Sequence, residues 1–417
     1  MTSGRASLTV LFWVALVLAL GYFGFRFARP DSGEDIRTSL SVSDVMGGSS
    51  TEGFARALEP RVFEFPRDHG PHPSYRTEWW YITGNLENPQ GDPYGFQFTI
   101  FRSALDGSPP IGASSWATNQ VFMGHFAVTD GSGRTFRGFE RFSRVANGLA
   151  GAQADPFRVW LEDWVLEGPV GPSTDPGQGA APGTGIFPLL LSAAEEDRGL
   201  SLLLIPEKPL VLQGDAGLSQ KGSEAGNASY YYSFTRMRAE GTLTLGDQQF
   251  PVNGSAWLDR EWSTSALSQD QVGWDWFALQ LSDGTDLMYY QLRLRDDSPD
   301  PLSKGILVDR TGRSELLASG QVELTVLDRW QSPLGGAPYP SRWHLAVPEE
   351  DIDLEVVPIL PDQELDLTFR YWEGAVRVTG TAGGQDVDGR GYVELTGYAD
   401  GTTPTRNPAI SRGGSRP

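Results

Sequence analysis

The feature that most constrains the fold is a repeated alternation of apolar and polar residues. Such runs occupy Tyr94 to Phe101 (YGFQFTIF), Arg158 to Gly168 (RVWLEDWVLEG), Gly273 to Leu281 (GWDWFALQL) and Asp286 to Arg295 (DLMYYQLRLR). Side chains on a β-strand point alternately to its two faces, so this period of two predicts strands. Turn sequences such as SDGT and DGSGR separate the runs, and 50 glycines and 29 prolines suit frequent turns. We therefore predict an all-β sandwich or barrel built from hairpins.

The N-terminal residues depart from this pattern. Residues 6–25 (ASLTVLFWVALVLALGYFGF) contain no charged side chain, and this length suits a helix that crosses a membrane. A cleavable signal usually has a shorter apolar region followed by small residues, whereas RFARP follows here. We expect an anchor in the inner membrane, with the bulk of the chain periplasmic or otherwise extracytoplasmic. The alternative is a signal peptide whose cleavage releases a secreted protein.

Composition divides the chain into five segments. Residues 1–30 contain the predicted anchor or signal, and residues 31–58 are polar and rich in small residues, as in a linker. Residues 59–264 and 265–402 are each long enough for one barrel or sandwich, and the polar stretch STSALSQDQ spans the boundary. Residues 403–417 are predicted to be a disordered tail. The Gly- and Pro-rich insertion GPVGPSTDPGQGAAPGTG is expected to be a surface loop.

Charge and missing motifs exclude several classes of function. The formal net charge is -20, which repels phosphate backbones, so no nucleic-acid partner is expected. Cysteine is absent, which excludes thiol nucleophiles and Cys-type zinc sites. The sequence contains no P-loop lysine, no H-E-x-x-H and no G-x-S-x-G. We expect neither a cofactor nor a metal.

The segment FPRDHGPHPSYRTEWWYITGNL combines two histidines, acidic residues and adjacent tryptophans. A buried core avoids the charges and a solvated loop avoids the tryptophans, whereas the wall of a pocket accommodates both. We predict that its strand crosses the first barrel near the mouth, with tryptophan faces toward a ligand and Glu78 paired with an arginine. The candidate ligand-binding residues of this segment are His69, His72, Glu78, Trp79 and Trp80.

The histidines allow a second interpretation. His69 and His72 lie beside Asp68, and Glu78 or His125 would complete a set of zinc ligands. The surrounding DHGPHP is rich in Gly and Pro, which orders a turn without a metal. We favour histidines that form hydrogen bonds at a strand entrance, and we include His125 among the candidate ligand-binding residues.

The stretch GSAWLDREWSTS carries the sharpest candidate for chemistry. On a strand, Trp257, Asp259 and Glu261 share one face, and the other face carries Leu258, Arg260 and Trp262. A carboxyl group flanked by aromatic rings in a dry cavity holds its proton near neutral pH and can donate it to an alkene or a leaving group. Two carboxylates on one face also match the pair of a glycosidase. An ion pair with a neighbouring arginine at a barrel rim is the structural alternative.

The GWDWF stretch repeats the aromatic theme. Trp274 and Trp276 share one strand face, with Asp275 on the other. They form either an outward aromatic girdle or the inner wall of a site for a long apolar ligand. With Trp262, they complete the candidate ligand-binding set.

Four ordered segments resemble the AttH family, which is related to carotenoid 1,2-hydratases and often described as secreted hydrolases. They are FPRDHGPHPSYRTEWWYITGNL, AWLDREWSTS, GWDWFALQLSDGTDLMYYQLR and YWEGAVRVTG…GRGYVELTGY. The resemblance extends from about Glu59 to Thr402. It implies two tandem lipocalin-like antiparallel β-barrels, in agreement with a weak internal similarity between residues 241–262 and 371–398.

The resemblance also implies a site. Carotenoid hydratases add water across a terminal double bond, and their proposed acid is the aspartate of an aromatic-x-Asp strand motif, which Trp257-x-Asp259 matches. Where those enzymes have His-x-Trp and His-Asn, this chain has SYYYSFTR and Arg260-Glu261. The catalytic candidates are therefore Asp259 as proton donor, Glu261 or Tyr232 to orient water, and Trp257.

Three functions remain open at this point. The first is a membrane-tethered binding protein for an apolar lipid or isoprenoid, with partners in envelope transport. The second is a hydratase or hydrolase that uses Asp259 as acid, and the third is a glycan-active enzyme that uses Asp259 and Glu261. A buried Asp259 in an enclosed cavity would favour an enzyme, whereas a wide apolar cavity without titratable groups would favour a carrier.

Overall fold

The structure is a computed structural model, and it describes residues 51–107, 118–170, 184–264, 267–268, 270–296 and 298–399. In those residues, no helix has the length and apolarity needed to span a membrane. The predicted anchor at residues 6–25, the predicted tail and most of the Gly- and Pro-rich insertion lie outside the described part.

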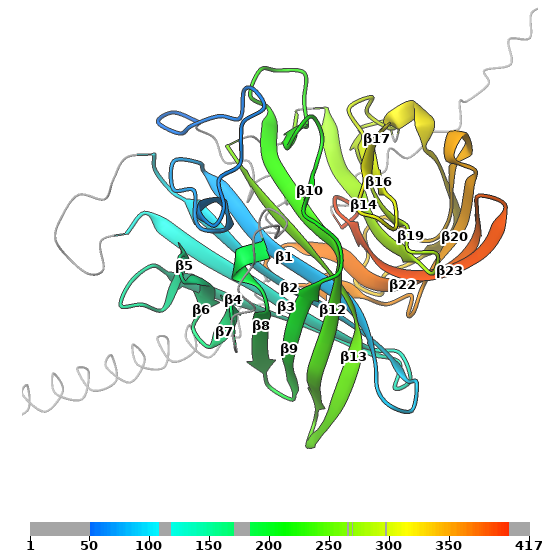
Figure 1. Cartoon of the computed structure of the whole chain (residues 1–417), viewed down its shortest axis with the longest axis horizontal. Coiled ribbons are helices and arrows are strands. Elements are labelled where there is room, and N and C mark those ends of the chain that lie inside the picture. Colours follow the sequence, from blue (N-terminus) through cyan, green and yellow to red (C-terminus); the bar gives the residue numbers. More distant parts are fainter. Residues whose placement is uncertain are drawn as a thin grey trace, which may run out of the picture. The chain divides into compact units, whose positions relative to one another are not determined.

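Two antiparallel sheets make up the described chain (Figure 1). Sheet A has 13 strands: β1 (Thr77–Glu87), β2 (Pro93–Ala104), β3 (Gln120–Asp130), β4 (Thr135–Arg144), β5 (Ala150–Ala154), β6 (Phe157–Leu161), β7 (Trp164–Gly168), β8 (Leu189–Glu195), β9 (Arg198–Pro206), β10 (Val211–Leu212), β11 (Leu218–Gln220), β12 (Ala228–Leu245) and β13 (Gln248–Ser263).

Sheet B has 10 strands: β14 (Gln271–Leu281), β15 (Asp286–Leu294), β16 (Lys304–Val308), β17 (Ser314–Ala318), β18 (Glu323–Trp330), β19 (Tyr339–Val347), β20 (Ile352–Pro358), β21 (Glu364–Asp366), β22 (Arg370–Ala382) and β23 (Gln385–Leu395). Single 3-10 turns occur at Arg67–His69, Thr184–Ile186, Ser319–Gln321 and Pro348–Glu350. The all-β prediction is confirmed.

The two sheets share one connection pattern. The first strand of sheet A, β1, pairs with β2 and with the last strand, β13. The first strand of sheet B, β14, likewise pairs with β15 and with the last strand, β23. Each sheet curls on itself and ends in a long hairpin, β12–β13 or β22–β23 (Figure 1). This repetition matches two lipocalin-like units in tandem, and the chain passes from sheet A to sheet B between Ser263 and Gln271.

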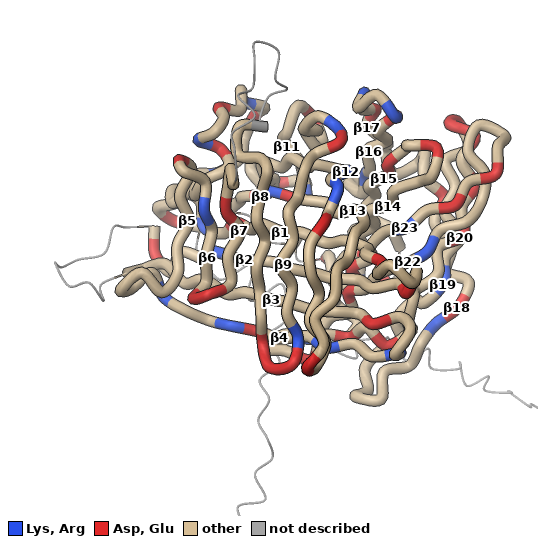
Figure 2. Tube along the Cα trace, turned by 60° about the horizontal axis from the view of Figure 1, so that its bottom comes forward, with Lys and Arg blue, Asp and Glu red and all other residues tan. Residues whose placement is uncertain are grey.

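Side chains fill the interior of each sheet. Inside sheet A, Trp80, Phe96, Phe98 and Trp262 belong to one large apolar cluster, and inside sheet B a second cluster contains Trp343. A third cluster lies between the sheets and includes rings from β1, β12, β13, β14 and β15. Many charged residues lie at the turns between strands (Figure 2).

The side chains of β13 point alternately into the core of sheet A and into the space between the two sheets. Arg260 and Trp262 point into sheet A, where the Arg260 guanidinium lies 3.9 Å from the centre of the Trp80 ring. Asp259 and Glu261 point the other way, toward sheet B. This is the division of faces that the sequence predicted for β13.

Candidate active site

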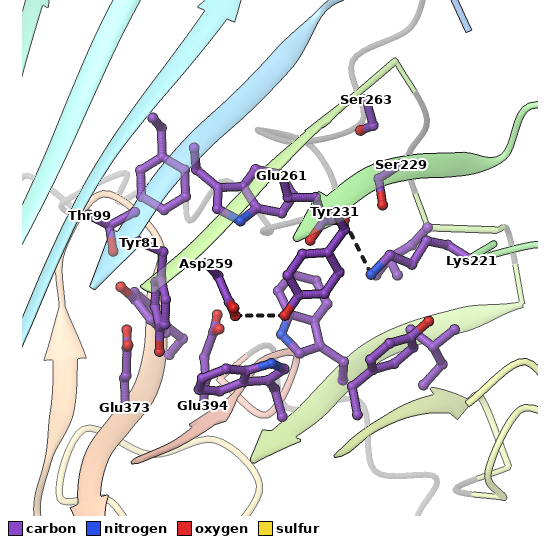
Figure 3. A pocket seen from close by; sticks show the side chains of 18 of the residues that line it. Tyr81, Thr99, Lys221, Ser229, Tyr231, Asp259, Glu261, Ser263, Glu373 and Glu394 are labelled. Atoms are coloured by element: carbon purple, nitrogen blue, oxygen red, sulfur yellow. Dashed lines mark hydrogen bonds and ion pairs between the residues drawn. The ribbon is translucent and has the colours of Figure 1, made fainter. Parts of the chain in front are cut away.

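A pocket lies between the two sheets rather than inside either barrel. Its wall comes from β1, β2, β12 and β13 of sheet A and from β14, β15, β22 and β23 of sheet B (Figure 3). Its cavity volume is about 130 Å³. Its aromatic lining consists of Trp79, Tyr81, Phe101, Tyr231, Trp274, Trp276, Tyr290, Phe369 and Tyr371. Its ionisable lining, apart from tyrosines, consists of Lys221, Asp259, Glu261, Glu373 and Glu394.

Three side chains hold the carboxyl group of Asp259 in place. The Tyr231 hydroxyl donates to Oδ2 over 2.6 Å, and the Trp257 indole N–H donates to Oδ1 over 2.7 Å. The Ser233 hydroxyl also donates to Oδ1. Tyr231 and Ser233 lie on β12, and Trp257 lies on β13, the strand that also carries Asp259. Ser233 is directly opposite Asp259 in this hairpin. The side chain is therefore buried, at 3 % exposure, and fixed in orientation.

Burial raises the pKa of Asp259 from its usual value to about 7. The hydrogen bonds from Ser233, Tyr231 and Trp257 stabilise the ionised form and oppose this rise, whereas the Glu261 charge adds to it. Among the described residues, no Arg, Lys or His forms an ion pair with Asp259. A carboxyl group without a cation in an apolar site keeps its proton close to neutral pH, as a general acid requires.

Two further carboxyl groups enter the pocket from sheet B. Burial raises the pKa of Glu394 to about 8, and the nearby Asp259 and Glu261 add to the rise. Burial and the neighbouring Glu394 raise the pKa of Glu373 well above its usual range. Figure 3 shows Glu373 and Glu394 below Asp259, on the sheet B side of the pocket. The protonated forms of these groups make this side of the pocket close to neutral.

The opposite end of the pocket contains an ion pair. Lys221 Nζ lies 3.2 Å from Glu261 Oε1 and 4.3 Å from the centre of the Tyr290 ring (Figure 3). Burial lowers the pKa of Lys221, but Glu261, together with Tyr290 and Asp259, outweighs this effect and the net pKa is raised. Glu261 is thus bound to a cation, in contrast to Asp259.

Two polar atoms in the wall have no hydrogen-bond partner within the described part of the chain. They are the Tyr81 hydroxyl and Glu373 Oε1, whose residues are 7 % and 1 % exposed. Both residues line the pocket. The Tyr81 hydroxyl nevertheless acts on the Glu373 carboxyl group and lowers its pKa, so the two groups are neighbours in the pocket wall.

The structure brings together some of the residues that the sequence singled out. Asp259, Glu261, Trp79, Trp274 and Trp276 line the pocket. Trp257 holds Asp259 through its indole N–H. The tryptophans of GWDWF therefore form part of an inner wall, as one of the two sequence interpretations required.

Other predicted residues lie elsewhere, because the strand period directs them into sheet A. Tyr232 points into the core, where its hydroxyl lies 2.6 Å from His69 Nδ1, and the adjacent Tyr231 faces the pocket instead. Trp80 and Trp262 are in the same core. The expectation that both tryptophans of the WW pair face a ligand is thus wrong for Trp80.

Glu78 and His72 belong to a buried charge network beside that core. Glu78 forms ion pairs with Arg102 and Arg260, which fulfils the predicted Glu–Arg pairing. The His72 ring stacks on Trp262 at 3.8 Å and lies 3.2 Å from Glu78 Oε2. Burial alone raises the pKa of Glu78, but the two arginines hold it well below its usual range. These groups stabilise the fold and do not reach the pocket lining.

His125 approaches the pocket without lining it. Its Nδ1 lies 2.8 Å from the hydroxyl of Tyr371, which does line the pocket, and its Nε2 lies 3.1 Å from Glu140 Oε1. The histidine itself is 0 % exposed.

Sequence reasoning missed Tyr81, Tyr231, Lys221, Glu373 and Glu394. The internal similarity contained a signal for Glu394. Glu261 lies opposite Trp79 on β1 and Tyr231 on β12, and Glu394 lies opposite Trp276 on β14 and Glu373 on β22. The two glutamates therefore occupy equivalent positions in the two sheets.

The fold and the site together define a two-sheet β protein with an acidic, aromatic pocket between the sheets. The model of the AttH-like family matches residues 56–398, and the chain belongs to this family. The predicted resemblance is thus confirmed.

Two solved structures share the fold. A protein described as AttH from Nitrosomonas europaea is 35% identical, with a TM-score of 0.70, over 83% of this chain and 100% of that chain. Kievitone hydratase from Nectria haematococca is 15% identical, with a TM-score of 0.60, over 83% of this chain and 96% of that chain.

Among curated proteins, kievitone hydratase of Fusarium solani subsp. phaseoli is 24% identical over 194 residues, which are 45% of this chain. The match spans about half of the curated relative, 53% of its length. This chain is therefore related to a hydratase through an AttH-like fold.

Proposed function

We propose that this protein is a hydratase that adds water to a carbon–carbon double bond of an apolar substrate in the pocket between the sheets. The observation that carries the proposal is the buried Asp259, which forms no ion pair within the described residues and accepts hydrogen bonds from three donors in an aromatic pocket. The relationship to kievitone hydratase supports the reaction class.

Asp259 supplies the proton in this proposal. Its Oδ1 already accepts two hydrogen bonds, so Oδ2 is the oxygen that carries the transferable proton. Transfer of this proton to one alkene carbon leaves a cation on the other carbon, and the faces of nearby Trp and Tyr rings stabilise it. Water attacks the cation, and the Asp259 carboxylate takes the proton that the water loses. The acid is thus restored at the end of each turnover.

The other pocket residues shape the environment for this chemistry. Tyr231 keeps Oδ2 oriented, and the protonated forms of Glu373 and Glu394 avoid the cost of desolvating charged carboxylates when an apolar substrate enters. Tyr231, rather than Tyr232, thus takes the role near Asp259 that the sequence suggested for a tyrosine. The Glu261–Lys221 ion pair engages the second carboxylate that a glycan-active site would need.

An apolar carrier is the second candidate, because nine aromatic residues line the pocket. The titratable wall favours the enzyme over the carrier. A lipid or isoprenoid remains the substrate class that we propose, and the anchor at residues 6–25 and the extracytoplasmic location remain predictions.

The proposal is tested by incubating the protein with a panel of prenylated and acyclic isoprenoid alkenes in water enriched in ¹⁸O. Mass spectrometry should detect a product that has gained one labelled water with the wild type and not with Asp259→Asn. Alkenes that bind to both the wild type and Asp259→Asn and are recovered without chemical change would identify a carrier. An absence of both binding and turnover across the panel would contradict the proposal.

A further inference from the structure

A chain of titratable groups connects the pocket with the protein surface. Glu140 lies on β4, His125 on β3, and Tyr371 and Glu373 lie two residues apart on β22, so both side chains face the pocket. Glu140 Oε1 is 3.1 Å from His125 Nε2, and His125 Nδ1 is 2.8 Å from the Tyr371 hydroxyl. The Glu140 side chain is 14% exposed and therefore reaches solvent, whereas His125 is fully buried.

The neighbours of these groups fix their protonation. In the described part of the chain, the titratable groups that bond to His125 are Glu140 and Tyr371, and the rings of Phe101 and Phe369 cover it. Burial lowers the pKa of His125, which keeps the ring neutral. Burial raises the pKa of Glu140, but hydrogen bonds from His125 and Thr368 outweigh it and lower the pKa.

An ionised Glu140 sets the direction of the hydrogen bonds. A carboxylate only accepts, so His125 carries its proton on Nε2 and accepts the Tyr371 O–H at Nδ1. Tyr371 and Glu373 leave the same face of β22 two residues apart and line the same pocket, so the Tyr371 oxygen is the relay atom next to the acid form of Glu373. Glu373 in turn faces Tyr81 of β1 and Glu394 of β23.

We propose that Glu373, Tyr371, His125 and Glu140 form a proton relay between the pocket and solvent. In one passage, Glu373 gives its proton to the Tyr371 oxygen, and Tyr371 gives its own proton to His125 Nδ1. His125 releases the proton on Nε2 to the Glu140 carboxylate, which passes it to solvent. Glu373 ends as a carboxylate, His125 ends as the other tautomer, and the reverse passage reloads the pocket.

The relay gives His125 a role that its position outside the pocket leaves unexplained. An apolar substrate in the aromatic pocket would block the route for protons through the pocket itself. The relay enters from the far side, through β3 and β4, and keeps Glu373 in equilibrium with solvent. This inference rests on the proposed function for its purpose but not for its test.

The test is infrared spectroscopy of the full-length protein, with squalane filling the pocket so that water does not reach Glu373 directly, after a rapid change from H₂O to D₂O buffer. The band of the protonated Glu373 carboxyl group is assigned by its loss in Glu373→Gln. The relay predicts that Tyr371→Phe and Glu140→Gln slow the deuterium shift of this band by roughly tenfold or more. Glu140→Gln changes the partly exposed group at the solvent end of the relay.

The matched control is Tyr290→Phe, which removes a pocket hydroxyl that bonds to Ser219 outside the relay. It should leave the exchange rate unchanged. An unchanged rate in Tyr371→Phe, an equal slowing in Tyr290→Phe, or no band lost in Glu373→Gln would each overturn the relay. Slowed exchange in a protein that hydrates no alkene would sustain the relay and reject the proposed hydratase.

Discussion

Glu78 and Asp259 are two buried carboxylic acids on neighbouring strands of sheet A, at 0 % and 3 % exposure. Glu78 lies among two arginines and a histidine, whereas three neutral donors surround Asp259. The pKa of Glu78 is far below its usual range, and that of Asp259 is raised to about 7. The two acids are thus similarly buried but differ in ionisation. The acid with neighbouring cations is ionised, and the acid without an ion pair keeps its proton.

The two acids therefore have different roles on the two faces of sheet A: Glu78 stabilises the fold, and Asp259 is the candidate acid in the pocket. Arg260 and Asp259 are adjacent on β13, and the strand alternation sends the arginine to Glu78 and the aspartate to the pocket. An acid paired with cations contributes to the fold and has no proton to give. When a buried acid has no cation beside it, burial destabilises its ionised form, so the acid has a proton available near neutral pH.

The largest expected effect is on catalysis. Asp259→Asn removes the transferable proton and should lower the hydration rate by about 10²- to 10⁴-fold, the usual contribution of a general acid. Asp247→Asn changes an exposed aspartate at the turn of the same hairpin and should retain full activity. Turnover in the ¹⁸O assay measures both variants, and a fully active Asp259→Asn would end the assignment of the acid.

Glu78→Gln should destabilise the folded protein, because the Glu78 carboxylate holds a buried charge network together. It leaves Arg102 and Arg260 buried without their carboxylate, so we expect a loss of roughly 3–5 kcal/mol in unfolding free energy. The control Glu87→Gln lies at the other end of β1, where the residue is 45% exposed and 4.0 Å from Arg390. That variant should lose at most about 1 kcal/mol. Urea unfolding measures both, and equal losses would show that the Glu78 network adds nothing beyond a surface pair.

Stability should depend on pH through Asp259. Its folded pKa of about 7 lies above the unfolded value, so the folded state keeps a proton that the unfolded chain has already released. Wild-type stability from this group is therefore present in acid and is lost as the pH rises to about 7. Asp259→Asn lacks this loss and should gain on the order of 2–4 kcal/mol relative to wild type between about pH 4 and about pH 8. A constant difference across that range would contradict the raised pKa.

The smallest expected effect compares adjacent tyrosines. Tyr231→Phe removes a hydrogen bond that favours ionised Asp259, so the alkaline limb of the activity profile should move up by about one pH unit. Tyr232→Phe removes the bond to His69 in the core and should cost roughly 0.5–1.5 kcal/mol of stability. Its activity profile should stay in place. Equal shifts in both variants would show that the effect is not transmitted through the Asp259 hydrogen bond.

The sequence was enough to predict the fold and one half of the site. Alternating runs such as GWDWFALQL identify strands, and the same alternation places Asp259 and Arg260 on opposite faces of β13. It does not show which face meets the second sheet. That is why a barrel interior was expected to hold the ligand, whereas its residues pack into closed cores.

The rest of the site depends on contacts between the sheets. Glu373 and Glu394 come more than a hundred residues after Asp259, and only the packing of sheet B on sheet A brings them to the pocket. Likewise, the choice of Tyr231 over Tyr232 depends on the exact pairing of β12 with β13, which composition does not reveal. The N-terminal anchor lies outside the described residues and stays a prediction.

The most direct test of the account is a ¹³C NMR titration of the Asp259 carboxyl group in the full-length protein, assigned with Asp259→Asn. The account predicts a pKa of about 7, well above the usual aspartate value of about 4. A midpoint near about 4 would mean that Asp259 is ionised at neutral pH and has no proton for an alkene. That result would contradict both the acid role of Asp259 and the contrast with Glu78.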